Sequence, residues 1–274
     1  FLALKTATAD GHHYIEDAIA KGASLIIGQS IGQFIDAHPK VAFLQHDAPL
    51  EVLRQWARAK RAKLEGPVLG ITGSNGKTVV KEWVFELLGS PVGVHRTPAS
   101  FNSALGVPLT LAGIGNEHHS ALIEVGIDRP GTMEAQATLV QPTVGVFTTL
   151  GDAHGEHFAI DDEKFREKWL LFASCERIAA ARPWIDKATA LGLPVPNPLV
   201  WGPGEALDPA HLPELPFSEG HHLENAMSAA AGAMLMGASL DEVRARLTKL
   251  EPLEMRMQLR AARDGGYLLE DTYS

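Results

Sequence analysis

The sequence predicts an α/β fold, in which a small N-terminal α/β domain precedes a central domain with a mainly parallel sheet. From residue 67 onward, strand-like apolar segments alternate with helix-like amphipathic segments, which is typical of a parallel sheet with helices on both faces. One strand-like segment, Val68–Ile71, also runs into a glycine-rich turn and then an amphipathic helix. With 274 residues, 45% of them hydrophobic, the chain is long enough for two such domains.

Residues 1–48 are expected to form a small, truncated N-terminal domain. Short apolar strands at 1–4, 24–27 and 41–44 alternate with a helix-like segment, 12–21, that begins after Asp10-Gly11. The chain starts inside a strand and without methionine, which we interpret as the loss of an N-terminal portion.

Residues 49–66 are expected to form a connecting helix. Its basic face carries Arg54, Arg58, Lys60, Arg61 and Lys63, and its other side carries Leu50, Leu53 and Trp56.

Residues 67–260 are expected to form the central domain, and residues 261–274 the start of a C-terminal domain that the chain otherwise lacks. Residues 182–216 are rich in proline and glycine and show little periodicity. The strands expected after residue 66 are 68–71, 121–125, 143–149 and 267–270, and the helices are 79–88, about 162–173, 223–235 and 240–250.

The turn Thr72-Gly-Ser-Asn-Gly-Lys-Thr78 has the composition of a phosphate-binding loop (P-loop). Backbone N–H groups of such a loop, at a helix N-terminus, present aligned donors to an anion. Lys77 can reach the outer phosphates and the Thr78 hydroxyl can hold Mg²⁺. The turn therefore predicts binding of a nucleoside triphosphate, ATP or GTP.

This loop is a variant, because the commonest form of the motif requires glycine where the chain has Ile71. The alternative interpretation is an ordinary helix that begins with Gly-Lys-Thr by chance. The order of strand, loop and helix favours the phosphate site. Apolar residues follow Lys77 at helical spacing, which predicts a helix packed on a sheet: Val80, Trp83, Val84, Leu87 and Leu88.

Polar residues at the ends of two later strands are expected to rim the same crevice. Glu124 lies near the end of one strand, and Thr148 and Thr149 lead into Gly151-Asp-Ala-His154. Ligands collect at the carboxyl ends of parallel strands, so Glu124 and His154 form a candidate Mg²⁺ pair. Each of them alone could equally be a solvated or hydrogen-bonded side chain.

Charge and cysteine content exclude several classes of function. A net charge of −9 argues against a nucleic-acid or membrane-surface partner. Cys175 is the only cysteine, so the sequence has neither a disulfide framework nor a cysteine zinc site, and we interpret this residue as part of the core. We find neither a signal peptide nor an apolar run that could span a bilayer, which favours a cytoplasmic protein.

Seven segments together resemble the Mur ligase family, ATP-dependent enzymes that form amide bonds in peptidoglycan synthesis. They are 72–78, Asn102-Ser-Ala-Leu-Gly-Val-Pro108, Ile-Glu124-Val-Gly, Gly151-Asp-Ala-His154, Glu224-Asn225-Ala, Met255-Arg256 and Asp271-Thr-Tyr. Within the family, the opening segment, Phe1-Leu-Ala-Leu-Lys-Thr6 with Asp10-Gly-His12, is similar to that of members that join D-alanyl-D-alanine to UDP-N-acetylmuramoyl-tripeptide. The segments 151–158 and 167–172 are similar to forms fused to a C-terminal alanine racemase, which would lie beyond residue 274.

The resemblance implies a set of site residues with distinct roles. Lys168 would be carbamylated by CO₂ and, with Glu124 and His154, would hold a second Mg²⁺, so that Lys77, Lys168 and His154 form the catalytic group. Taken alone, Lys168 is a helix-surface lysine beside acidic neighbours. The other implied contacts are Asn225 to adenine, Arg256 to the phosphates, Asp271 to the ribose, Lys5, Thr6 and Asp10 to the UDP end of the substrate, and Asn102 to its reacting carboxyl group.

One departure concerns adenine, because many members carry asparagine where this chain has His222. Three alternatives to the D-alanyl-D-alanine ligase remain at this point. The first is a sister ligase that adds a single amino acid, the second is a folylpolyglutamate-type ligase, and the third is a non-catalytic ATP-binding switch. A zinc hydrolase built on His154-Gly-Glu156 lacks a second histidine at ligand spacing.

Overall fold

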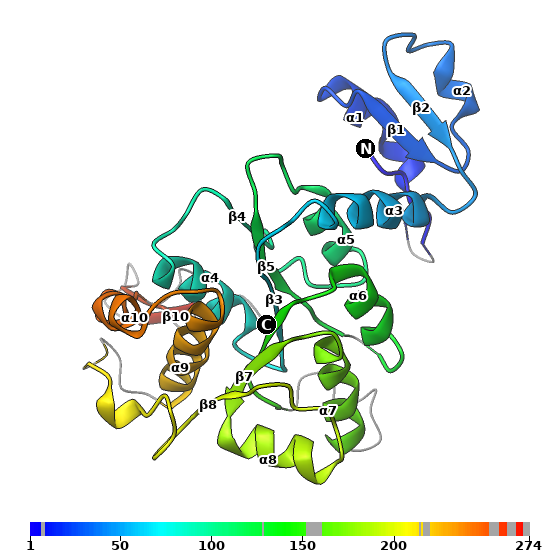
Figure 1. The fold of residues 1–274 in the computed structure, drawn as a ribbon. Helices are drawn as coiled ribbons and strands as arrows, with labels where there is room; N and C mark the ends of the chain where they lie inside the picture. The colour runs from blue at the N-terminus through cyan, green and yellow to red at the C-terminus, as the bar shows by residue number, and fades with distance from the viewer. Residues whose placement is uncertain are drawn as a thin grey trace.

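The computed structural model describes residues 1–6, 9–127, 129–151, 161–213, 215 and 220–251, and the backbone of 258–261 and 267–270. A small N-terminal unit lies apart from a larger α/β unit, and helix α3 (Pro49–Arg61) runs between them (Figure 1). Within the described residues, no helix is both long and apolar enough to cross a membrane.

The N-terminal unit is built on two parallel strands, β1 (Leu25–Gly28) and β2 (Ala42–Gln45). The expected strand at 1–4 is reduced to a bridge between Leu2 and Ile27. The expected helix at 12–21 is a short 3₁₀ turn, η1 (Gly11–Tyr14), followed by α1 (Ile15–Ala20), and α2 (Gly32–Ile35) lies between the strands. A core of Ala3, Ile15, Ile26 and Ile31 closes this unit.

Helix α3 packs through a face that agrees with the predicted apolar side at Leu53 but differs from it at Trp56 and Arg61. Leu53, Ala57 and Arg61 are buried, whereas Trp56 is 45% exposed. Arg61 donates from Nε to the carbonyl oxygen of Val140 and from Nη2 to that of Gln141, at 2.7 and 2.6 Å. The prediction failed for Arg61 because its guanidinium donates hydrogen bonds to carbonyl groups at the C-terminus of helix α6 (Met133–Val140).

The larger unit contains a six-stranded parallel sheet of order β4-β5-β3-β6-β7-β8, which confirms the predicted sheet. Its central strand, β3, pairs with β5 on one side and β6 on the other. The register places Ile71 opposite Glu124, and Thr72 opposite Phe147, so that three strands end at one level. The strands are β3 (Val68–Thr72), β4 (Val94–Arg96), β5 (Ser120–Glu124), β6 (Val144–Phe147), β7 (Arg177–Ala181) and β8 (Leu199–Trp201).

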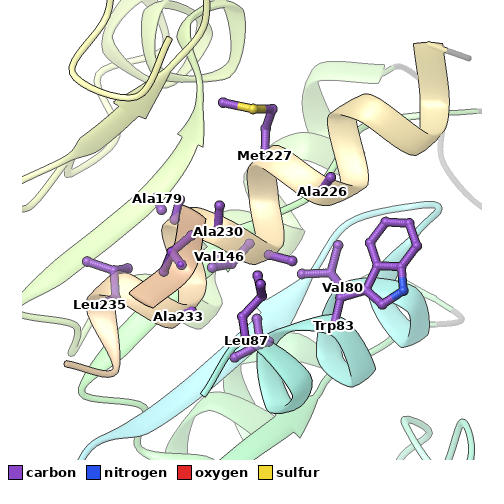
Figure 2. Packing of buried hydrophobic residues seen from close by; sticks show 14 of the residues in the cluster. Val80, Trp83, Leu87, Val146, Ala179, Ala226, Met227, Ala230, Ala233 and Leu235 are labelled. Atoms are coloured by element: carbon purple, nitrogen blue, oxygen red, sulfur yellow. The ribbon is translucent and has the colours of Figure 1, made fainter. Parts of the chain in front are cut away.

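Helices cover both faces of this sheet over two separate cores. On one face, the helix after the glycine-rich turn packs against α9, and the predicted residues Val80, Trp83, Val84 and Leu87 are all fully buried there (Figure 2). Leu88 is only partly buried at the edge of this core. The helices are α4 (Lys77–Leu87), α5 (Gly106–Ala112), α6 (Met133–Val140), α7 (Asp161–Trp169), α8 (Arg182–Ala190), α9 (Gly220–Leu235) and α10 (Leu240–Leu247), with 3₁₀ turns η3 (Leu170–Phe172) and η4 (Pro209–His211).

Residues 182–216 are more regular than the sequence indicates. Helix α8 and strand β8 lie in this stretch, and β8 extends the sheet by pairing with β7. Pro183 stands in the first turn of α8, where a missing N–H costs nothing, so this proline starts a helix rather than interrupting one. The sequence analysis also gave no elements at β4, α5, α6 or β7.

The other expected elements are present with boundaries shifted by a few residues. Strands β9 (Gln258–Ala261) and β10 (Tyr267–Glu270) form an antiparallel pair, and β10 coincides with the predicted strand at 267–270. Cys175 is buried, and burial raises the pKa of its thiol to about 12, as expected for a core residue.

Candidate active site

The glycine-rich turn joins β3 to α4 at the centre of the sheet, and two of its glycines cannot be replaced without a clash. Gly73 has φ +148°, and a Cβ there would lie 2.0 Å from the Oγ1 atom of Thr148. Gly76 has φ +78°, and its Cβ would lie 2.1 Å from the Oδ1 atom of Asn225. The loop after β6 and helix α9 therefore approach the backbone of the turn closely, as a phosphate cradle requires.

The loop after β6 borders the turn, as the sequence predicts. The N–H of Ser74 donates to the carbonyl oxygen of Thr149 at 2.7 Å, and its hydroxyl donates to that of Gly151 at 3.1 Å. The hydroxyl of Thr148 donates to the carbonyl oxygen of Asn75 at 2.6 Å. These bonds fix the shape of the turn from outside it.

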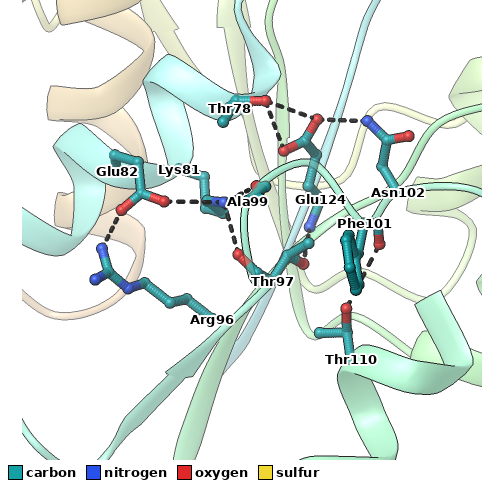
Figure 3. A network of polar contacts seen from close by, with 10 residues as sticks. All are labelled: Thr78, Lys81, Glu82, Arg96, Thr97, Ala99, Phe101, Asn102, Thr110 and Glu124. Atoms are coloured by element: carbon teal, nitrogen blue, oxygen red, sulfur yellow. Dashed lines mark hydrogen bonds and ion pairs between the residues drawn. The ribbon is translucent and has the colours of Figure 1, made fainter. Parts of the chain in front are cut away.

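Glu124 meets the start of α4 at the carboxyl end of β5 (Figure 3). The Thr78 hydroxyl donates to both of its carboxylate oxygens, at 3.1 and 2.9 Å, and the Asn102 side chain donates to Oε1 at 2.6 Å. Glu124 is only 1% exposed. The carboxylate is thus held beside the start of α4 by neutral donors from two different segments.

A buried lysine, absent from the sequence prediction, holds the segment that carries Asn102. Lys81 is fully buried on α4 and donates to the carbonyl oxygens of Thr97 and Ala99, at 2.6 and 2.5 Å (Figure 3). The Thr97 hydroxyl accepts the N–H of Glu124 at 2.9 Å. A lysine at helical spacing within the apolar stripe of α4 is the one sequence signal that could have revealed this contact.

Lysine amines gather around the turn on its other side. Lys77 donates to the carbonyl oxygens of Gly73 and Ser74, at 3.1 and 3.0 Å, and Lys168 on α7 donates to that of Gly73 at 3.1 Å. Lys164, one helical turn before Lys168 and unmarked by the sequence analysis, donates to the carbonyl oxygen of Gly151. Together these amines make the turn strongly attractive to an anion.

Lys168 is buried, which corrects its interpretation as a helix-surface residue. It is 2% exposed. Burial away from water, together with the ammonium groups of Lys77 and Lys164, lowers the pKa of Lys168 to about 7. A large fraction of this amine is therefore neutral, and hence nucleophilic, at neutral pH.

The predicted residues in this part of the chain converge on one crevice. Lys77, Lys168 and Asn102 line a cavity of about 190 Å³ together with Ser103, Gly126 and Ile127. Asn225 of α9 approaches the turn at Gly76. Thr72 is fully buried, and its hydroxyl oxygen has no hydrogen-bond partner within the described residues.

Three predicted site residues, His154, Arg256 and Asp271, lie outside the described residues. Within the part that is described, no three acidic, histidine or cysteine side chains gather as a metal site. Of the predicted metal ligands, the structure therefore describes Thr78, Glu124 and Lys168.

The substrate residues predicted in the N-terminal unit lie apart from the phosphate loop. Lys5 and Asp10 line a separate pocket of about 440 Å³ with His12, Gln29 and Ser30, whereas Thr6 hydrogen-bonds to Ala9 in the adjoining turn. His12 is not among the site residues predicted from the sequence. Its Nδ1 lies 2.6 Å from Oδ1 of Asp10, and its Nε2 accepts from the backbone of Gln29 and Ser30, so Nδ1 carries the proton.

Part of the chain matches the model of a known protein family. Residues 71–191, which include the phosphate loop, Glu124 and Lys168, match the Mur ligase middle domain. The family resemblance inferred from the seven sequence segments is thereby confirmed.

Several known proteins match this chain over its whole length. UDP-N-acetylmuramoyl-tripeptide–D-alanyl-D-alanine ligase of a Synechocystis species is 29% identical over all of this chain and 63% of its own length. UDP-N-acetylmuramoylalanyl-D-glutamyl-2,6-diaminopimelate–D-alanyl-D-alanyl ligase from Acinetobacter baumannii has the same fold, with a TM-score of 0.79, 23% identity, and coverage of 100% of this chain and 65% of that one. MurF ligase from Thermotoga maritima, whose structure was solved with ADP, matches with a TM-score of 0.77 and 24% sequence identity. The match covers 100% of this chain and 67% of that one.

The chain thus spans a little under two thirds of the length of the first curated relatives that it matches.

Proposed function

We propose that this chain provides the ATP-binding core of a ligase that joins D-alanyl-D-alanine to UDP-N-acetylmuramoyl-tripeptide in peptidoglycan precursor synthesis. The observation that carries the proposal is the meeting of Thr78 with Glu124 beside Lys77 and Lys168 at one end of the sheet. A phosphate loop alone would fit any nucleotide-binding protein. A buried carboxylate and a buried, partly neutral lysine on either side of it favour phosphoryl transfer to a third, anionic reactant.

In this proposal the tripeptide carboxylate attacks the γ-phosphate of ATP, which forms an acyl phosphate and releases ADP. The amine of D-alanyl-D-alanine then attacks the acyl carbon, which forms the amide bond and releases phosphate. Lys77 and the N–H groups of 73–78 neutralise the phosphates, and the Asn102 amide orients the reacting carboxyl group. The residues act mainly by placing fixed positive charge where negative charges must approach one another.

Mg²⁺ fits the donor set of this crevice. The Thr78 hydroxyl, the Glu124 carboxylate and the unpartnered Thr72 hydroxyl supply hard oxygen atoms of the kind that Mg²⁺ prefers. Thr78 would hold the first Mg²⁺ ion. Glu124, with His154 as a further ligand, would hold the second. Bound Mg²⁺ would neutralise charge on the phosphate oxygens.

We further propose that Lys168 carries a carbamate. Its neutral amine would add to the carbon of CO₂ and release one proton, so that a cation becomes an anionic oxygen ligand for the second Mg²⁺. The lowered pKa of Lys168 supports this step, because only the unprotonated amine can attack.

The remaining assignments follow the family resemblance. Asn225 would contact adenine, Arg256 the phosphates and Asp271 the ribose, and Lys5, Thr6 and Asp10 would bind the UDP end. The close approach of Asn225 to Gly76 supports the first of these. The domain boundaries, the cytoplasmic location and the fused alanine racemase stay predictions.

The decisive experiment measures ADP release by the full-length protein with ATP, Mg²⁺ and UDP-N-acetylmuramoyl-tripeptide. Parallel reactions contain D-alanyl-D-alanine, single amino acids or no amine. We expect release that requires both the tripeptide and D-alanyl-D-alanine. Release with a single amino acid would instead indicate a sister ligase, and no release with any pairing would favour the non-catalytic switch.

A further inference from the structure

A second pocket adjoins the proposed catalytic crevice, between helices α3, α5 and α6. It has a volume of about 130 Å³ and is lined by Arg54, Arg129, Thr132 and Gln136. Ala104 lines both this pocket and the cavity that contains Lys77 and Lys168, so the two spaces share a wall. At about 30 Å³ for each water molecule, the pocket has room for roughly four waters, or for one carboxylate with the N–H group on the same carbon.

The charges that border this pocket are mainly positive. Arg54 and Arg58 share a single carboxylate, that of Glu51, at 3.1 and 3.5 Å. Arg129 has no side-chain partner within the described part of the chain, although its backbone oxygen accepts from Thr132. Glu134 does not line this pocket but lines a neighbouring one, together with Arg54 and Arg58. The charged side chains that line the pocket itself are thus both guanidinium groups, which suit an anionic ligand.

Gln136 adds an unpartnered acceptor to these cations. The residue is 5% exposed, and its Nε2 donates to the carbonyl oxygen of Gly126 at 2.6 Å. That bond fixes the orientation of the amide, because a carbonyl oxygen can only accept. Oε1 of Gln136 then has no hydrogen-bond partner among the described residues, and a buried acceptor without a partner is costly unless a ligand supplies a donor.

We propose that this pocket binds an unreacted carboxylate of the substrate peptide, on a carbon that also carries an N–H group. Arg54 and Arg129 would bind the carboxylate, and Oε1 of Gln136 would accept the N–H. The inference rests on the proposed function, because it takes the reacting carboxyl group to lie beside Lys77 and Asn102. Gly126, which lines the crevice and accepts from Gln136, links the two spaces.

Two parts of the peptide have this chemistry. The name of the Acinetobacter baumannii relative gives the peptide as alanyl-D-glutamyl-2,6-diaminopimelate. Its 2,6-diaminopimelate keeps a carboxylate and an amino group at the end that does not react, and its D-glutamyl residue keeps one free carboxylate beside an amide N–H. A lysine in place of 2,6-diaminopimelate would keep the glutamyl group and lose only the other carboxylate.

The test uses the full-length protein and two precursors, one with 2,6-diaminopimelate and one with lysine at the third position. The variants are Arg54→Gln and Arg129→Gln. The control is Arg177→Gln, because Arg177 is exposed at the first residue of strand β7 and has no side-chain contact described. KM and kcat for each precursor are measured, and ATP affinity without peptide checks that the fold is intact.

We expect each variant to raise KM by about 10- to 100-fold, the range for losing a hydrogen bond to a charged group, with kcat and ATP affinity little changed. A loss confined to the diaminopimelate precursor places that residue in the pocket, and an equal loss on both precursors places the glutamyl carboxylate there. Variants that match Arg177→Gln on both precursors would overturn the inference. Wild-type protein inactive on both precursors would instead contradict the proposed function.

Discussion

At the residue scale, the site depends on single polar groups that are buried beside the phosphate loop. Glu124 accepts hydrogen bonds from residues on two other segments and is almost fully buried. Lys168 is buried with its amine against the loop backbone. Neither property is visible in the sequence, where the two residues are an ordinary carboxylate and an ordinary lysine.

Replacement of Glu124 by glutamine should separate a ligase from a nucleotide switch. The change keeps the size of the side chain but removes the anion, so we expect ADP release to fall by about 10²- to 10³-fold, as when one preorganised charge-stabilising group is lost. Glu176→Gln, on an exposed residue before β7, is the control. Full ADP release by the Glu124→Gln variant would argue against the metal assignment.

The lowered pKa of Lys168 makes stability depend on pH in a defined direction. The unfolded lysine titrates near 10.4 and the folded one near 7, so between these values the unfolded chain binds more protons and stability rises with pH. Below pH 7 the buried lysine is charged in the folded protein, and the full cost of burying that charge lowers the free energy of unfolding. The difference in unfolding free energy between wild type and Lys168→Met should change by up to about 1.4 kcal/mol per pH unit from 7 to 9.

Urea titrations at pH 6, 7, 8 and 9, without nucleotide or added bicarbonate, measure this difference. The wild-type protein should gain on the variant as pH rises. A difference that is constant over this range would mean that Lys168 keeps an ordinary pKa in the folded protein.

At the element scale, the turn between β3 and α4 is shaped by segments that pack against it. Helix α9 brings Asn225 to Gly76, and the loop after β6 brings Thr148 to Gly73. Gly232 on the same helix α9 lies where a Cβ would contact Val84 at 2.9 Å, so α9 packs closely on α4 and the sheet. The shape of the turn therefore depends on the position of α9 as well as on local glycines.

Gly76→Ala should damage nucleotide binding far more than a comparable change elsewhere. The new methyl group would meet Asn225 in addition to the strain of a positive φ. Gly192, with φ +68° and nothing within 4 Å, is the matched position, where alanine brings only the backbone cost of about 1 to 2 kcal/mol. We expect ATP affinity, measured by calorimetry, to fall at least tenfold for Gly76→Ala and to stay unchanged for Gly192→Ala. Equal effects would mean that the contact with Asn225 is unimportant.

At the scale of the whole molecule, the N-terminal unit has its own core, separate from the two cores that flank the large sheet. Helix α3, by contrast, packs on α5 and α6 and hydrogen-bonds to the end of α6. The N-terminal unit should therefore be able to unfold while the larger unit stays folded.

Ile26→Ala should lower the stability of the N-terminal unit by about 2 to 5 kcal/mol, since Ile26 is fully buried there. Hydrogen exchange should then increase in residues 1–46 and remain slow in β3, β5 and β6, and ATP affinity should be retained. The paired variant Leu69→Ala, in the central strand, should increase exchange in the sheet instead. Exchange that increases throughout the chain in both variants would show that the units unfold together.

The sequence by itself determined the P-loop, the alternation of strands and helices, and the polar residues at strand ends. Each of these features depends on residues that are only a few positions apart in the chain. It missed α8 and β8 within 182–216, where proline and glycine begin and end elements instead of breaking them, and it misjudged Trp56 and Arg61 on α3. Only the tertiary structure decided which distant residues meet.

Thr78 and Glu124 are 46 positions apart and Gly73 and Lys168 are 95 apart. Their contacts follow from the order β5-β3-β6 and from the helices that pack over it, and burial then sets the pKa of Lys168. Such contacts depend on long-range packing, for which no local periodicity exists.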